Sequence, residues 1–224
     1  MYENLLRLPY FQGMSRDDIT SILDKITFEF KKYSHGETIY NQGDKCDHFA
    51  ILTNGTLSCT RKSPDGTYSI TEELHAPYAI EPYSMFGYST SFRHGYTATG
   101  ECTILVIDKQ YLFSQFTRHD IFTINFLNLI SCRTQKSIHD TWYHTPSNIE
   151  GRIANFIATR CESPNGTKHI SIKMERLASI LCETRLNISK ALNSMQEAGM
   201  LELRRGGITI HALEKLNTYI KEEQ

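Results

Sequence analysis

Residues 28–108 place the strongest constraint on the fold, because short apolar and polar runs alternate there between turn signals. Four of these runs read HFAIL, TLSCTR, TYSITEEL and TILVID. Alternation with a period of two is typical of strands that bury one face. The pair Asn54-Gly55 and the segment 63–66, SPDG, are typical of hairpins and turns. Many short strands at this spacing predict a barrel or a double-sheet roll.

Helical spacing precedes and follows this strand-rich region. Residues 15–30 predict a short helix capped by Ser15 or Asp17. Its expected buried face contains Ile19, Ile22, Leu23 and Ile26. Residues 109–145 have helical spacing over several turns, and the apolar stripe of this helix contains Ile121, Ile124, Leu127, Ile130, Ile138 and Trp142.

The stripe in residues 109–145 has two interpretations. It can pack on the roll, or it can meet the same helix of a second subunit. A helix this long between two domains has little else to bury against, so the subunit interface is favoured. The expected interface residues are Ile124, Leu127, Ile130 and Ile138. Pro146 cannot continue the helix without a large cost, so we expect a domain boundary there.

Residues 182–192, CETRLNISKAL, predict a helix with two distinct faces. The apolar face, which continues beyond this stretch, contains Ile188, Ala191, Leu192 and Met195. The other face is long or hydrogen-bonding, a selection that a merely solvated helix would not need; it contains Arg185, Leu186, Ser189, Lys190 and Asn193. A shorter helix around Leu177 precedes this one, and the segment MLELRRGGITIHA after it reads as two strands. This order predicts a winged helix-turn-helix.

The start of the second helix suits contact with DNA. Thr184 can cap it through its hydroxyl, and the N–H groups there favour a nearby phosphate. Arg185 in the first turn can bond the O6 and N7 atoms of guanine together, and Ser189 and Lys190 lie one turn further on. The expected DNA-binding set is Thr184, Arg185, Leu186, Asn187, Ser189, Lys190, Arg204 and Arg205.

The distribution of charge supports this interpretation. The whole chain of 224 residues has a net charge of −1, whereas residues 168–211 hold seven Lys or Arg and four Glu. Arg204 and Arg205 at the wing tip suit phosphate contact. The alternative interpretation is a solvated surface helix in a small helical domain.

Composition narrows the class of protein further. Hydrophobic residues make up 40% of the chain and charged residues 22%, which is typical of a soluble globular protein. No apolar run approaches the roughly 20 residues of a membrane span, and the N-terminus lacks the apolar core of a signal peptide. The six cysteines include no C-x-x-C pair. We therefore expect a cytoplasmic protein with scattered thiols and no metal site.

Nearly the whole chain resembles the CRP/FNR family of bacterial transcription regulators. Residues 35–59, HGETIYNQGDKCDHFAILTNGTLSC, resemble the family's first glycine-punctuated strands. Residues 84–112, SMFGYSTSFRHGYTATGECTILVIDKQYL, resemble the segment that holds the effector phosphate in nucleotide-binding members, followed by the strand that closes the roll. GRIANFI at 151–157 resembles the start of the DNA-binding domain. Residues 177–210, LASILCETRLNISKALNSMQEAGMLELRRGGITI, resemble its helix-turn-helix and wing.

The resemblance and the order of elements imply an α+β fold. Its expected parts are an N-terminal double-stranded β-helix (jelly) roll over 1–114, a dimerisation helix and hinge over 115–145, and a C-terminal winged helix-turn-helix over 146–224. The implied function is that of a homodimeric, sequence-specific regulator that binds palindromic half-sites in double-stranded DNA, with RNA polymerase as a further partner. A second subunit would place the two recognition helices about 34 Å apart, one helical turn of DNA.

Departures from the family's motifs carry their own expectations. Nucleotide-sensing members hold the ribose through a glutamate after a Phe/Ile-Gly pair, and the phosphate through an arginine before a small hydroxyl residue. Here Tyr88 follows Phe86-Gly87, and no arginine lies at the matching place. We therefore expect that cyclic AMP is not the effector. The candidate effector pocket, which its own aromatic side chains can also fill, is Tyr83, Phe86, Gly87, Tyr88, Arg93, His94 and Ser137.

The recognition helix departs as well, because Leu186 replaces the usual glutamate. A leucine cannot accept a cytosine amino hydrogen but can contact a thymine methyl, so the operator should differ from the family's best-known consensus. The family's iron–sulfur members use N-terminal cysteines, whereas the first cysteine here is Cys46, so no iron–sulfur cluster is expected.

Two other functions stay open at this point. A haem- or redox-sensing regulator of the same family would need axial His or Cys ligands, and nothing in the sequence selects one. A cupin-like metal enzyme would need clustered histidines, and the roll histidines show no H-x-H spacing; they are His35, His48, His75 and His94.

Overall fold

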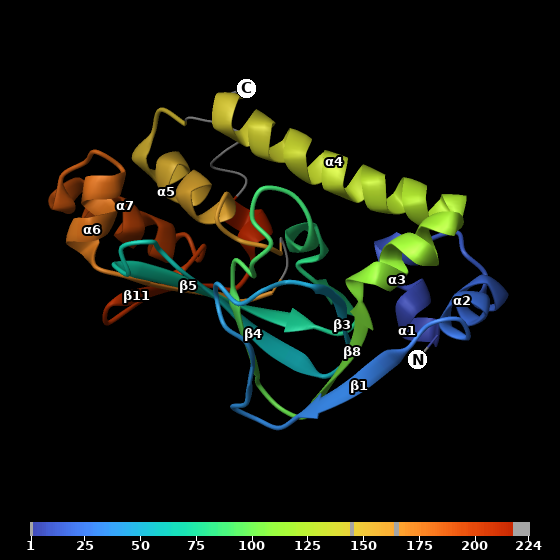
Figure 1. The fold of residues 1–224 in the computed structure, drawn as a ribbon. Coiled ribbons are helices and arrows are strands. Elements are labelled where there is room, and N and C mark those ends of the chain that lie inside the picture. Colours follow the sequence, from blue (N-terminus) through green and yellow to red (C-terminus); the bar gives the residue numbers. More distant parts are fainter. Residues whose placement is uncertain (1, 144–145, 164–165, 217–224) are drawn as a thin grey trace. The chain divides into compact units, whose positions relative to one another are not determined.

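The structure is a computed structural model, and it describes residues 2–143, 146–163 and 166–216 (Figure 1). The chain divides into two compact units. Unit 1 comprises residues 1–59 and 74–135, and unit 2 comprises residues 60–73 and 136–224. Each unit has a hydrophobic core of its own, because the two clusters of buried apolar side chains share no member.

Unit 1 contains two antiparallel groups of strands. A four-stranded sheet has the order β1-β8-β3-β6, formed by Phe28–Tyr33, Cys102–Asp108, His48–Asn54 and Tyr78–Ile80. Separately, β2 (Thr38–Tyr40) pairs with β7 (Gly95–Ala98). Phe49 pairs with Ile107 and Ile51 pairs with Leu105, and all four side chains are buried. The strands expected from HFAIL and TILVID therefore lie side by side in the core of the roll.

Gly55 shows why a tight turn separates β3 from the next strand. Its φ is +91°, in the left-handed region that favours glycine. A Cβ added there would also lie 2.6 Å from Cβ of Cys102, closer than real side chains pack. The expected turn at Asn54-Gly55 is confirmed, and it depends on glycine twice over.

The helices of unit 1 are shorter than the sequence patterns predicted. The expected helix over 15–30 is α2, Arg16–Leu23, which begins with a capping box between Ser15 and Asp18. It ends early because Phe28 already pairs with Ile107 in the sheet. Strand pairing therefore outweighs the helical spacing of the last few residues. The remaining N-terminal elements are α1, Tyr2–Leu6, and a 3-10 turn, Pro9–Phe11.

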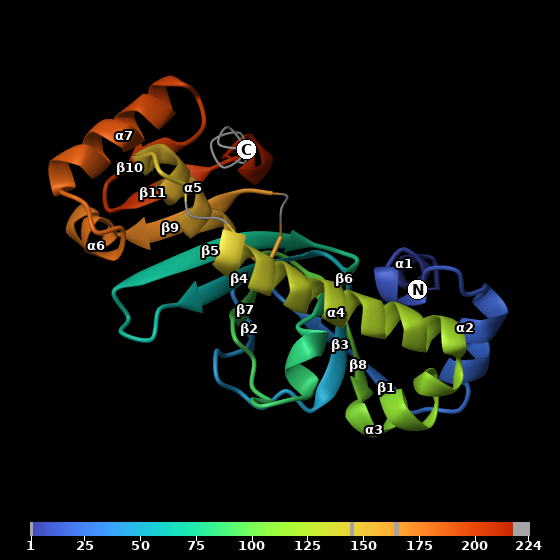
Figure 2. The same ribbon diagram turned by 90° about the horizontal axis from the view of Figure 1, so that it is seen from above.

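The expected helix over 109–145 is interrupted. It consists of α3 (Lys109–Ser114), a 3-10 turn (Phe116–Arg118) and α4 (Asp120–Tyr143), which is a single unbroken helix (Figure 2). The interruption lets Phe116 enter the core, where its ring lies 5.0 Å from that of Phe122. The side chain of Trp142, expected in the apolar stripe, lies outside the described residues.

Unit 2 contains the predicted helices and wing. Its elements are α5 (Ile149–Ala158), β9 (Lys168–Ile172), α6 (Met174–Ile180), α7 (Arg185–Glu197), β10 (Glu202–Arg204) and β11 (Gly207–Ile210). Helix α5 begins three residues after Pro146, and Asn148 caps it by accepting a bond from the N–H of Gly151. The wing strands β10 and β11 pair antiparallel, and β11 pairs in turn with β9.

Unit 2 also contains residues 60–73, the distal part of a hairpin from far earlier in the chain. Strands β4 (Thr56–Lys62) and β5 (Tyr68–His75) join through the SPDG turn, and β5 pairs antiparallel with β9 from Tyr68–Ile172 to Glu72–Lys168. Ile70 enters the core of unit 2 opposite Ile170. The strands in this unit therefore run β10-β11-β9-β5.

Polar contacts fasten the hairpin to the rest of unit 2. Glu72 accepts a bond from Lys168 Nζ at 2.8 Å, and from the N–H groups of Glu162 and Ser163 at 2.6 and 3.1 Å. Arg176 of α6 donates to Asp65 at 2.5 Å in the hairpin turn. The Ser63 and Thr67 hydroxyls, helped by Arg176, lower the pKa of Asp65 to about 2.

This arrangement differs from the expected boundaries 1–114, 115–145 and 146–224, which cut the chain into contiguous pieces. Residues 60–73 group with the helix-turn-helix instead of the remaining roll. The physical reason is the β5–β9 ladder and the core position of Ile70, neither of which a local sequence pattern reveals.

Candidate nucleic-acid interface

The turn between α6 and α7 sets the geometry of the helix-turn-helix. Cys182 has φ +52°, and its N–H donates to the carbonyl of Ser179 at 3.3 Å. The N–H of Glu183 reaches back to the carbonyl of Ala178 at 2.9 Å. These two bonds form a Schellman motif, which ends α6 abruptly and lets α7 begin after four residues.

Helix α7 begins as predicted. Thr184 is its N-cap, and its Oγ1 accepts a bond from the N–H of Asn187 at 3.1 Å. The four residues predicted to pack are all buried in the core of unit 2; they are Ile188, Ala191, Leu192 and Met195. Because this face packs in the core, the opposite face of α7 must point to solvent.

The exposed face of α7 presents the residues expected to read bases. Arg185 has 70% of its side chain exposed, and its Nε lies 3.3 Å from Oε1 of Glu175 on α6. Leu186 and Lys190 are also exposed, whereas Ser189 is half-buried. The structure therefore brings a cation, a branched apolar side chain and a second cation onto adjacent turns of one face.

Asn187 lies differently from the other expected contacts. It is half-buried, and its amide donates to Oε2 of Glu183 at 3.2 Å. Glu183 also binds Arg152 of α5 at 2.8 Å. The Asn187 amide, together with Arg152, lowers the pKa of Glu183, so this carboxylate stays ionised and holds the start of α7 against α5. In the described structure Asn187 supports the helix start.

The wing carries the remaining basic residues. Arg204 ends β10, and Arg205 and Gly206 form the turn into β11. Gly206 has φ +77°, in the left-handed region that favours glycine. Both arginine side chains are exposed, and Arg204 lies 3.4 Å from Glu202.

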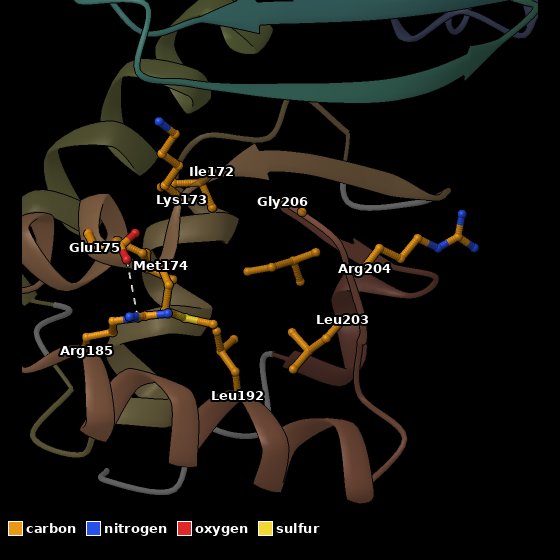
Figure 3. Close-up of a pocket in the computed structure, with 12 residues that line it drawn as sticks. Ile172, Lys173, Met174, Glu175, Arg185, Leu192, Leu203, Arg204 and Gly206 are labelled. Atoms are coloured by element: carbon orange, nitrogen blue, oxygen red, sulfur yellow. Dashed lines mark ion pairs between the residues drawn. The ribbon is translucent and has the colours of Figure 1, made fainter.

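A hollow of about 260 Å³ lies between the starts of α6 and α7 and the wing (Figure 3). Arg185 and Glu175 meet on one side of it, and Leu192 and Leu203 point into it (Figure 3). Arg204 also lines the hollow, with its guanidinium pointing outward (Figure 3). Lys173, which was not among the expected contacts, lines the same hollow at the start of α6. The only sequence feature that could have indicated Lys173 as a contact is its position next to the helix-turn-helix.

The expected effector residues do not gather in one enclosed pocket within unit 1. Tyr88 is fully exposed, with a relative exposure of 108%. The rings of Phe86 and Phe113 lie 5.1 Å apart, and Lys109 lies over Phe86 at 4.4 Å. Arg93 and Gly87 are exposed. Tyr83 lies under Arg133, at 3.7 Å from ring centroid to guanidinium, whereas Ser137 is an exposed residue of α4 in unit 2.

The interior of the roll is occupied by its own side chains. Phe92 is buried and stacks on Tyr40 with ring centroids 4.2 Å apart, and Tyr96 is buried beside them. His94, the one expected pocket residue that is buried, bonds to the carboxylate of Glu81 at 2.6 Å. Glu81 was not among the site residues expected from the sequence. The available signal was a lone acid inside the apolar run of Tyr78–Met85.

The seam expected along α4 is apolar and uncovered in the single chain. Ile124, Leu127 and Ile138 are exposed, and Ile130 is half-buried. Among the described residues, no helix is long and apolar enough to cross a bilayer. The same residues include no group of three or more His, Cys, Asp or Glu placed to hold a metal ion.

Comparisons with known proteins agree with both halves of the chain. The cyclic nucleotide-binding domain model matches residues 30–119, and the Crp-like helix-turn-helix domain model matches residues 151–219. The CRP-like cAMP-activated global transcriptional regulator of Mycobacterium tuberculosis is 20% identical over 227 residues, 96% of this chain and 98% of the relative.

Solved structures share the fold. The catabolite activator protein of Thermus thermophilus has a TM-score of 0.55 at 17% identity, covering 95% of this chain and 98% of that one. The sensor domain of the transcriptional regulator DNR from Pseudomonas aeruginosa has a TM-score of 0.52 at 17% identity, covering 61% and 89%.

A β-roll followed by a winged helix-turn-helix with an exposed basic face defines a DNA-binding transcription regulator. The chain belongs to the CRP/FNR family of bacterial transcription regulators.

Proposed function

We propose that this regulator acts as a homodimer that reads palindromic half-sites with α7. The observation that carries the proposal is Arg185, which is exposed at the capped start of a helix whose other face is fully buried. An arginine held there can form two bonds to one guanine, which discriminates bases by about 1–3 kcal/mol.

The other exposed side chains have separate roles in the proposal. Leu186 contacts a thymine methyl, and Ser189 and Lys190 reach a neighbouring base or phosphate. Arg204, Arg205 and Lys173 bind phosphates, which positions the helix without reading sequence. The Glu175 carboxylate holds Arg185 until guanine replaces it. Thr184 caps the start of α7, and the free N–H groups of the first turn of this helix bind a phosphate.

Dimerisation through α4 completes the proposed reading unit. Ile124, Leu127, Ile130 and Ile138 supply an apolar face that a second copy of α4 would cover. The twofold axis between the copies then requires two inverted half-sites about 34 Å apart, one turn of B-DNA.

Sensing and output are further parts of the proposal. We place the protein in the cytoplasm and expect RNA polymerase as its partner at promoters. The roll shifts the population of DNA-binding arrangements, and cyclic AMP is not its effector. The filling of the roll interior by Phe92, Tyr96 and Glu81 supports this last point.

Selection of bound duplexes from a random pool tests the proposal directly. The wild-type protein should enrich an inverted repeat with guanine at one fixed position of each half-site. The Arg185→Ala variant should retain the repeat and lose preference at that position. Enrichment of direct repeats, or of no motif at all, would contradict the proposed reading mode.

A further inference from the structure

Glu81 is fully buried in unit 1, and five groups donate hydrogen bonds to its carboxylate. Oε1 accepts from Nδ1 of His94 at 2.6 Å, from the N–H of His94 at 2.9 Å and from the hydroxyl of Tyr96 at 2.9 Å. Oε2 accepts from the hydroxyl of Ser84 at 2.7 Å and from the N–H of Arg93 at 2.8 Å. Glu81, His94 and Tyr96 are each no more than 1% exposed.

These donors match the needs of an anion. An ionised carboxylate is an acceptor only, with about four lone-pair sites, so five donors saturate it. Burial acts to raise the pKa of Glu81, but the bonds from His94 and the N–H of Arg93 outweigh burial, and the pKa is lowered overall. The group is therefore a buried, ionised oxyanion at neutral pH.

The donors come from two places in the chain. Ser84 follows Glu81 closely, whereas the N–H groups of Arg93 and His94 and the hydroxyl of Tyr96 belong to a loop and strand 12 to 15 residues later. Two consecutive N–H groups pointing at one anion are a common feature of phosphate and carboxylate sites. The site therefore combines donors from separate segments of the roll and is not a local helix cap.

The backbone at Glu81 is strained to bring its side chain into this site. Its φ of 40° and ψ of 50° lie in the left-handed region, which a residue with a Cβ adopts at a cost. Strain of this kind persists only where the surrounding contacts hold it in place. The five hydrogen bonds to the carboxylate are those contacts.

We propose that Ser84, Arg93, His94 and Tyr96 form an oxyanion-binding cradle, and that Glu81 occupies this cradle as a tethered ligand. A diffusible ligand with a carboxylate or phosphate group enters only when the Glu81 side chain leaves. A role for this exchange in regulating DNA binding rests on the proposed function. The existence of the cradle does not depend on DNA binding.

Removing the tethered carboxylate from the full-length protein tests the cradle. Glu81→Gly takes away the anion and also relaxes the left-handed backbone. In sodium chloride its thermal midpoint should lie below that of the wild type. Sodium acetate at the same ionic strength should raise that midpoint by about 3 °C or more, because acetate binds only the folded state. The wild type should melt alike in both salts.

Two matched variants separate the cradle from general salt effects. Glu81→Gln fills the same space without a charge, so acetate should not raise its midpoint. Glu101→Ala removes an exposed glutamate of the same unit and should respond like the wild type. Inorganic phosphate in place of acetate distinguishes the two classes of ligand: stabilisation by acetate alone assigns a carboxylate site, and stabilisation by both assigns a general oxyanion site.

The outcome that overturns the proposal is an equal response of Glu81→Gly and wild type to acetate and to phosphate. If Glu81→Gly does not fold in chloride, refolding in acetate should recover its native circular dichroism. Failure to refold in acetate and in phosphate, while Glu81→Gln folds, also overturns the proposal. All of these readouts are taken without DNA, so they stand whether or not the proposed operator is found.

Discussion

Nζ of Lys168 lies 2.8 Å from Oε2 of Glu72, and the two side chains are only 0% and 2% exposed. The pair joins the last register position of β5 to the first residue of β9. Two N–H groups complete the surroundings of the carboxylate. A buried ion pair thus joins β5 to β9, the strand that pairs with wing strand β11.

Lys168→Met should destabilise the protein strongly, because it leaves the Glu72 charge buried without its cation. Breaking one side of a buried pair costs about 3–5 kcal/mol. The double variant Glu72→Gln, Lys168→Met should lose less than the single variant. Denaturant unfolding measures both. The control is Lys31→Met, whose exposed contact with Glu29 should contribute at most about 1 kcal/mol. A loss under 1 kcal/mol for Lys168→Met would show that the pair is not closed in solution.

Arg185→Ala and Arg204→Ala should weaken DNA binding in different ways. The first should cost roughly 1–3 kcal/mol of specific binding and relax the preference at one base pair of each half-site. The second should weaken all sequences alike and lower the salt slope of log K by about one. Fluorescence anisotropy on matched and mutated operators, over a range of salt, distinguishes the two. Unchanged preference in Arg185→Ala would remove this residue from the reading face.

Leu127→Asp should convert the protein to monomers and abolish binding to the palindrome, because a charge then faces the apolar seam. Analytical ultracentrifugation measures the assembly. Asn128→Asp adds the same charge at the adjacent exposed position of α4 and serves as the control. An intact Leu127→Asp dimer would move the interface away from this face.

Cyclic AMP and cyclic GMP should bind orders of magnitude more weakly than they bind nucleotide-sensing members of the family. By the family resemblance, Tyr88 stands where nucleotide-sensing members have a ribose-binding glutamate. Its side chain is fully exposed, and Phe92 fills the roll interior. Loss of a charge-assisted bond to phosphate alone removes about 1.5–3 kcal/mol. Calorimetric titration of the full-length protein is the measurement, and micromolar affinity for either nucleotide would refute the expectation.

Cys182→Gly should stabilise the helix-turn-helix by about 0.5–1 kcal/mol. The residue is exposed and has φ +52°, so glycine relieves backbone strain without removing buried contacts. Cys182→Val should act in the opposite sense, since a β-branched residue fits the left-handed region poorly. Urea midpoints of the two variants provide the comparison; a lower midpoint for glycine than for valine would contradict the strain argument.

Local sequence patterns were sufficient to predict much of helix α7 and its N-cap. The four buried residues of α7 follow from a period of 3.6 alone, and the Thr184 cap follows from residue type and position. The strands from HFAIL and TLSCTR were also expected at β3 and β4. These features depend on neighbours within a turn or a strand, which the sequence displays directly.

Features that depend on distant contacts were missed. The helix over 15–30 was drawn too long because the pairing of Phe28 with Ile107 was not visible. The pairing of Glu72 with Lys168 and the cradle around Glu81 were missed for the same reason. The partners of each buried acid are distant in sequence and come near only in the fold. The residues on either side of each acid therefore give no sign that it is buried.

The β5–β9 ladder has a consequence for protein engineering. Strand β9 lies between β11 and β5, so both of its sides are hydrogen-bonded. A fragment that starts at Pro146 would lack the hairpin and present one row of unpaired backbone groups. Such an edge is a template for a strand of another chain, so the fragment is expected to associate edge to edge. A fragment for DNA work is therefore better made by linking residues 60–73 to residues 146–224 than by cutting at the boundary that the sequence suggests.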